Sequence, residues 1–207
     1  MVRLWLAALF LALNLTTIAP AMSVKAQEQH DPVIVVGMLD AYWATVFEAN
    51  EITYRSPRAE VLSDFTSSPC PVSYNMGPAA YCPSDQTIYV NPYDPMWSYD
   101  PAALYVILGH EFGHHVEWLL GFPDEISVES EQRSDCMAGA FVGAATSIGL
   151  ADTSTFIWSM WISINAGDDF AFGVPEEELV HDIAGHRAEA FNEGFRLGPS
   201  ACGIGLT

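Results

Sequence analysis

The stretch DPAALYVILGHEFGHHVEWLLGFP, residues 100–123, decides how this chain folds. Asp100 is typical of a helix N-cap, Pro101 of the first helical position, and Gly121 of a helix stop. The sequence therefore predicts a helix over about 101–120. The same segment contains a His-Glu-x-x-His pattern, so this helix also carries the candidate chemistry.

The pattern consists of His110, Glu111 and His114. In a helix, residues four apart lie on one face, one turn from each other. The two imidazoles can therefore bind a single Zn²⁺ at about 2.0–2.1 Å. Glu111 lies at the edge of the same face, within reach of a metal-bound water. This arrangement is typical of zinc peptidases, in which the glutamate is the general base.

A catalytic zinc needs three protein ligands and one open position. The sequence predicts a second helix from about Asp124 or Ser127 to Ser147, joined to the first by a short turn, so the two helices should be antiparallel. Glu131 lies as far beyond the turn as His114 lies before it, about 10 Å at about 1.5 Å of rise per residue. We therefore expect Glu131 to be the third ligand.

Three neighbouring residues have other expected places. Asp135 lies one turn beyond Glu131 and is placed to bond the far nitrogen of a ligand histidine, which fixes the orientation of the ring. Glu129 is a rival ligand, but it points across the helix. His115 is rotated about 100° from His114, so we expect it to pack or hydrogen-bond behind the site, against an acid such as Asp168 or Asp169.

The remaining periodic segments predict a small sheet followed by helices. Helices are expected at 38–50, 152–163 and 175–196, and strands at 59–65 and 86–92. Strands early and helices late indicate an α+β fold, here one domain that is mainly helical with a small sheet. The metal site is expected between the two antiparallel helices.

Residues 1–26 have the composition of a secretory signal peptide: a basic start, an apolar run and small residues before a cleavage point at Ala21 or Ala26. Polar residues interrupt the run short of the ~20 residues that a membrane span needs. We expect residues 27–207 to form an exported domain, periplasmic or extracellular. An uncleaved N-terminal membrane anchor is the alternative.

Charge limits the partners. The chain has a formal net charge of −19, and loss of residues 1–26 leaves 5 − 26 = −21. Such an acidic chain repels nucleic acid and anionic membrane surfaces. We expect no nucleic-acid partner and no stable membrane insertion after cleavage.

The chain has four cysteines: Cys70, Cys82, Cys136 and Cys202. An even number in an exported chain favours two disulfides over a thiol site. Three pairings are possible. The pairing 70–82 with 136–202 is favoured, because the first two cysteines flank a turn-rich stretch that could fold back on itself.

Two motifs resemble the bacterial family named putative neutral zinc metallopeptidases. They are HEFGHHV (110–116) and EQRSDCMAG (131–139), in which Ser134 replaces the usual alanine. Upstream, GPAAYCPSDQTIYVN (77–91) is similar to another segment of the family. Residues in the family's order follow downstream: 167–169, His181, Arg187, Phe191, 194–195 and Cys202. The resemblance covers roughly 38–202.

The resemblance implies a zincin-like domain with His110, His114 and Glu131 as zinc ligands and Glu111 as base. It also implies the 70–82 and 136–202 cysteine pairs. The family often has His-Gly where this chain has His181-Asp182, so the chain departs from the family's pattern next to His181.

The expected activity is hydrolysis of peptide bonds in a peptide or protein, with one zinc per chain. Zinc makes a water nucleophilic near neutral pH, and Glu111 takes its proton. His181, Tyr81 and Tyr89 are candidate donors to the oxyanion. The 86–92 strand is either a sheet edge that pairs with substrate or an internal strand. The alternatives are a zinc-binding protein without turnover and a zinc amidase with a non-protein substrate.

Overall fold

The computed structural model of the chain describes residues 31–62, 70, 77–98, 100, 102–123, 127–166 and 183–207. The helices are α2 (Pro32–Ala49), α3 (Ala102–Leu120), α4 (Val128–Ser147), α5 (Thr153–Asn165) and α6 (Ala184–Leu197). The strands are β1 (Arg58–Val61), β2 (Ala79–Cys82) and β3 (Thr87–Val90), and two 3₁₀ turns are η1 (Pro95–Ser98) and η4 (Pro199–Cys202). The predicted α+β fold, mainly helical with a small sheet, is correct.

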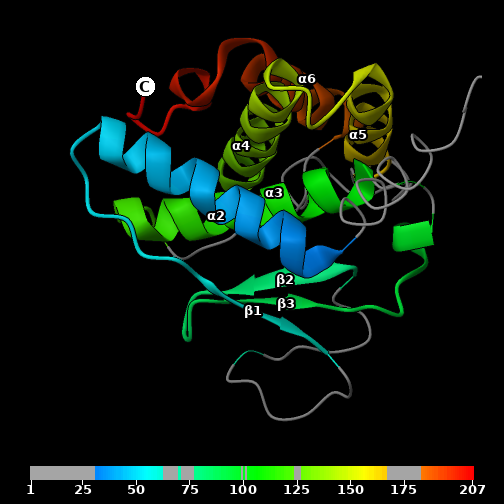
Figure 1. The fold of residues 1–207 in the computed structure, drawn as a ribbon, viewed down its shortest axis with the longest axis horizontal. Helices are drawn as coiled ribbons and strands as arrows, with labels where there is room; N and C mark the ends of the chain where they lie inside the picture. Colours follow the sequence, from blue (N-terminus) through cyan, green and yellow to red (C-terminus); the bar gives the residue numbers. More distant parts are fainter. Residues whose placement is uncertain are drawn as a thin grey trace, which may run out of the picture.

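The sheet has the order β1-β3-β2, with β1 parallel and β2 antiparallel to β3. It lies on one side of α2 and α3, and α4, α5 and α6 lie on the other (Figure 1). The strand predicted at 86–92 is therefore the internal strand β3. The edge strand near α3 is β2, which the sequence analysis did not identify.

Helix boundaries follow the caps. Asp31 accepts a hydrogen bond from Val33 N–H at 2.9 Å, so α2 begins at Pro32, earlier than the predicted residue 38. Asp100 Oδ1 accepts from Ala102 N–H at 2.9 Å at the start of α3. α6 begins at Ala184, after the extended Ile183, and residues 175–182 of the helix predicted at 175–196 lie outside the described residues.

α2 is the one helix among the described residues that is long and apolar enough to cross a membrane. Length and composition alone are weak evidence, and its inward side chains are part of the core: Val35, Leu39, Trp43, Val46 and Phe47. The expected signal peptide, residues 1–26, lies outside the described residues.

α4 lies between α3 and α6, and glycines allow the helices to approach closely. A Cβ on Gly113 of α3 would stand 2.6 Å from Ser134 Cα, and one on Gly194 of α6 would stand 1.8 Å from the Cys136 carbonyl oxygen. Both distances are shorter than any ordinary carbon contact. The glycines therefore set the helix spacing at which side chains of α3 and α4 meet.

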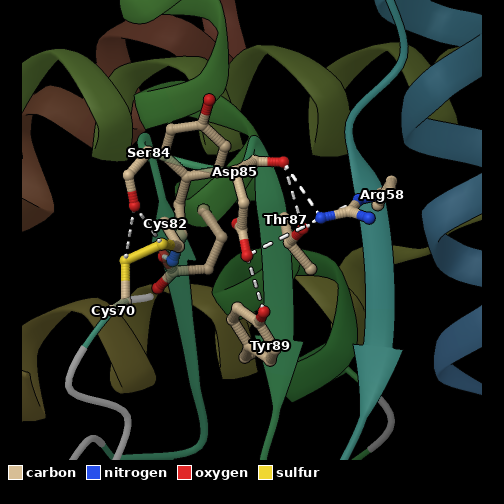
Figure 2. The surroundings of a disulfide bond; sticks show 9 residues. Arg58, Cys70, Cys82, Ser84, Asp85, Thr87 and Tyr89 are labelled. Carbon is tan, nitrogen blue, oxygen red and sulfur yellow. Dashed lines mark hydrogen bonds and ion pairs between the residues drawn. A yellow bond between two sulfur atoms is a disulfide. The ribbon is translucent and has the colours of Figure 1, made fainter. Parts of the chain in front are cut away.

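Both cysteine pairs have the predicted connectivity. Cys136 of α4 is bonded to Cys202 of η4, and Cys70 is bonded to Cys82 at the end of β2. Figure 2 shows the second bond beside Ser84 and the adjacent Asp85, which pairs with Arg58 of β1 and accepts from Tyr89 of β3. The side chain of Asp85, in the turn between β2 and β3, thus contacts both β1 and β3.

Candidate metal centre

Three side chains from α3 and α4 converge on one point: His110, His114 and Glu131. One ligand atom from each lies within 4.8 Å of the others. His110 Nε2 is 3.3 Å from Glu131 Oε2, and His114 Nε2 is 3.3 Å from Glu131 Oε1. The rival Glu129 is exposed and outside this cluster. The antiparallel helix pair brings together the residues that the spacing indicated.

The donor set fits a zinc ion. His110 Nε2 and His114 Nε2 face each other at 3.1 Å. Glu131 Oε2 is buried and accepts no hydrogen bond of good geometry from the described residues, although Arg187 Nη1 lies at ion-pair distance, 3.5 Å. A cation shared by two imidazole nitrogens and a carboxylate would satisfy all of these atoms together. Two histidines with one glutamate is a common ligand set of catalytic zinc.

Behind His110 lies a buried ion pair. Asp135 Oδ1 is 2.9 Å from His110 Nδ1. Arg187 of α6 binds Asp135 with two nitrogens, Nε at 2.7 Å and Nη2 at 2.8 Å. Asp135 therefore lies where the sequence placed it. Arg187 was named in the sequence analysis only as part of the family's order, and its contact with Asp135 was not foreseen.

Behind His114 lies a different group, which the sequence analysis missed. His114 Nδ1 is 3.1 Å from Ser134 Oγ and 3.4 Å from Glu117 Oε2. Glu117 accepts from Ser130 Oγ at 2.6 Å and pairs with Arg133 Nε. The spacing of three residues between His114 and Glu117 was a usable signal, because such residues are neighbours on a helix.

Opposite charges within the cluster shift the pKa values of its members. Burial lowers the pKa of His110, but Glu131 and Asp135 outweigh burial and raise this pKa to about 10. Burial raises the pKa of Glu131, but the two facing histidines outweigh burial and hold it well below its usual range. Zinc binds neutral imidazole and ionised carboxylate, so a metal competes here with protons on the histidines.

Glu111 lies beside the cluster, and the edge strand holds it. Its Oε2 accepts a hydrogen bond from the main-chain N–H of Tyr81 at 2.6 Å, and no described residue donates to its Oε1. The side chain is largely buried but lines the cavity described below. One carboxylate oxygen is thus held by β2.

His115 is fully buried on another face of α3. Its Nε2 is 2.7 Å from the carbonyl oxygen of Arg55, which can only accept, so we place the ring hydrogen on Nε2. Burial lowers the pKa of His115. In the neutral ring, Nδ1 accepts from the Tyr81 hydroxyl at 3.0 Å. The suggested partners Asp168 and Asp169 lie outside the described residues.

Neither tyrosine proposed as an oxyanion donor directs its hydroxyl at the metal cluster. The Tyr81 hydroxyl bonds His115, and the Tyr89 hydroxyl donates to Asp85 at 2.8 Å. His181, the remaining candidate, lies outside the described residues.

The cluster opens into a cavity of about 630 Å³ between β2, α3, α4, α5 and α6. Apolar side chains line it along α3 on both sides of the histidines. They are Met96, Val106, Ile107 and Ile162 toward the start of α3, and Trp118, Phe122 and Pro123 toward its end. The cavity has the size typical of ligand sites.

The family model described as "Putative neutral zinc metallopeptidase" matches residues 16–159. The chain is 26% identical over 197 residues to "Uncharacterized protein YpfJ" of Escherichia coli strain K12. The match covers 82% of this chain and 68% of that protein. The same values hold for the YpfJ of Escherichia coli O6:H1. No solved structure matches. With most of its length matched by the family model, the chain belongs to the putative neutral zinc metallopeptidase family.

Proposed function

We propose that this protein is a zinc-dependent peptidase. The observation that supports this most directly is the place of Glu111. Its carboxylate is fixed by the Tyr81 N–H, lines the cavity, and lies one residue from His110 of the metal cluster. A zinc site kept for structure alone has no need of an oriented carboxylate facing a cavity.

One zinc per chain would be held by His110, His114 and Glu131. When bound, zinc supplies the Lewis acidity that makes water a nucleophile near neutral pH. Asp135 would hold the Nδ1 hydrogen of His110, and Ser134 that of His114, so that both rings present Nε2.

The free oxygen of Glu111 takes the proton of the attacking water and then passes it to the leaving amine of the peptide. The Tyr81 N–H holds the carboxylate in place beside the cluster. An extended peptide would lie in the cavity beside β2, with apolar side chains of its own against the apolar walls.

The place of action that we propose is outside the reducing cytoplasm, in the periplasm or the extracellular medium. Two disulfides support this, since such bonds persist in oxidising compartments. The apolar run in residues 1–26 supports export as well.

The substitution Glu111→Gln tests the activity. It preserves the shape of the side chain but cannot take a proton, so peptide hydrolysis should fall by about 10²-fold or more while zinc content stays near one per chain. The measurement is cleavage of a diverse peptide mixture, read by mass spectrometry, with and without a chelator.

Glu129→Gln is the matched control, because Glu129 is exposed on the neighbouring helix. It should cleave like the parent. Undiminished cleavage by Glu111→Gln would remove Glu111 as the base. A parent that cuts no peptide but releases amine from non-protein amides would make the protein an amidase.

A further inference from the structure

Two hydrogen bonds through Tyr81 link His115 to Glu111, and a third ties His115 to Arg55. The Arg55 carbonyl accepts from His115 Nε2, His115 Nδ1 accepts from the Tyr81 hydroxyl, and the Tyr81 N–H donates to Glu111 Oε2. The distances are 2.7, 3.0 and 2.6 Å, and the last is short for an N–H donor to an oxygen. Tyr81 of β2 therefore bonds His115 through its hydroxyl and Glu111 through its main-chain N–H.

The surroundings of His115 leave its ring little freedom. The ring is fully buried and stacks on Trp118, with ring centroids 6.3 Å apart and planes 11° apart. Tyr54 and Tyr81 meet it edge-on, at 6.3 and 5.3 Å. The guanidinium carbon of Arg55 lies 5.1 Å from the ring centroid of Trp118, the ring on which His115 stacks. A ring packed in this way can hold a hydroxyl at a fixed point.

We propose that His115 is a positioning residue for the general base: by holding the Tyr81 hydroxyl it fixes β2 against α3, and so fixes the Tyr81 N–H on Glu111. The proposal rests on the role of Glu111 given above. It explains the histidine that follows the two metal-binding ones. His115 does not touch the metal cluster, yet it orients the carboxylate beside that cluster.

The test compares two variants with one control. His115→Phe keeps an aromatic ring but loses both hydrogen bonds, and Tyr81→Phe deletes the hydroxyl alone while it keeps the main-chain N–H. Tyr54→Phe is the control. Its hydroxyl donates to Asp40, away from Tyr81, although its ring also meets His115.

The first readout does not depend on activity. A short N–H bond to a carboxylate moves the amide proton downfield, so the NMR signal of residue 81 should move upfield in Glu111→Gln. His115→Phe and Tyr81→Phe should shift it in the same direction, and Tyr54→Phe should leave it in place. An unmoved signal in both His115→Phe and Tyr81→Phe would overturn the proposal.

The second readout is kinetic. Both variants should lower kcat about tenfold, with KM and zinc content unchanged, because a displaced base affects the chemical step. In a Glu111→Asp background, where the base is already displaced, the same substitutions should cost much less than tenfold. Full additivity would contradict action through Glu111. If the parent cuts no peptide but the signal of residue 81 responds as expected, the proposed function fails and the positioning stands.

Discussion

At the scale of single residues, the two histidines of the candidate metal site have different partners on their far sides. His110 Nδ1 faces the carboxylate of Asp135 at 2.9 Å, whereas His114 Nδ1 has the hydroxyl of Ser134 as its nearest partner, at 3.1 Å. Glu117 lies slightly farther, at 3.4 Å. Partners of this kind fix the tautomer and ring orientation of a ligand histidine. Through its contact with His114, Ser134 would therefore bear on metal binding.

Ser134→Ala should weaken zinc binding about tenfold, the low end for loss of such a partner, because Glu117 can still accept from His114. The melting temperature of the metal-free protein should change little. Zinc affinity is measured by competition with a chromophoric chelator. Ser147→Ala, an exposed serine on the same helix, is the control. Equal zinc affinity in Ser134→Ala and the parent would show that the hydroxyl does nothing for the metal.

At the scale of elements, the metal cluster depends on how closely α3 approaches α4. Gly113 lies directly against Ser134, and Gly109, one turn earlier, lies against Ala138. Small residues on both helices hold the axes close enough for Glu131 to reach both histidines. Gly113, the glycine in the His-Glu-x-x-His segment, is thus a packing residue directly before His114.

Gly113→Ala should destabilise the protein by about 1–3 kcal/mol, because the added methyl meets the Ser134 backbone and one helix must shift. Gly37→Ala on α2 should have the opposite sign. Gly37 has no described atom within 4 Å of the added carbon, and alanine is the better helix former by up to about 1 kcal/mol. Denaturant unfolding of both variants checks the pair. A neutral Gly113→Ala would mean that the helices can move apart freely.

The helices were predictable from the sequence because their signals are local. Caps and stops such as Asp100 and Gly121 lie next to the helices they bound. β2 was missed because Ala79–Cys82 is four residues long and has no alternation of apolar and polar side chains. Its place in the sheet depends on its pairing with β3, and the residues of a strand do not by themselves specify its partner.

The same distinction between local signals and long-range pairing applies to the candidate site. The histidines and Glu131 could be placed because they lie on two consecutive helices joined by a short turn. The partners of His115 could not, since Arg55 is 60 residues away and Tyr81 is 34 residues away. Contacts of this range depend on tertiary packing, which periodicity does not encode.

At the scale of the whole molecule, the Cys136–Cys202 bond joins α4, the helix that carries Glu131, to the C-terminal segment. It closes a separation of 66 residues, and Cys136 directly follows Asp135. Farther on, Thr207 bonds Asn50 at the end of α2 through both its main chain and its hydroxyl. The C-terminal segment thus joins the helix that carries Glu131 to the helix that begins the described fold.

Removal of this bond in a Cys136→Ser, Cys202→Ser double variant should lower the free energy of unfolding by about 4 kcal/mol in the chain-entropy description. It should also speed zinc loss, because α4 carries Glu131. The measurements are thermal unfolding and the rate of zinc transfer to a chelator. The control removes Cys70 and Cys82, which close a separation of 12 residues, and should cost less stability and leave the zinc rate unchanged. Parent-like zinc loss in the first variant would separate the bond from the metal.

The close approach of Gly113 to Ser134 also limits what protein engineering can do at this centre. The side chain of Ser134 is fully buried against Gly113, so a larger side chain at position 134 would press on α3. Attempts to install a fourth metal-binding side chain there would push the helices apart and lose the existing three. Redesign for another metal should therefore begin at exposed positions on the rim of the cavity, and the narrow gap between α3 and α4 should be treated as fixed.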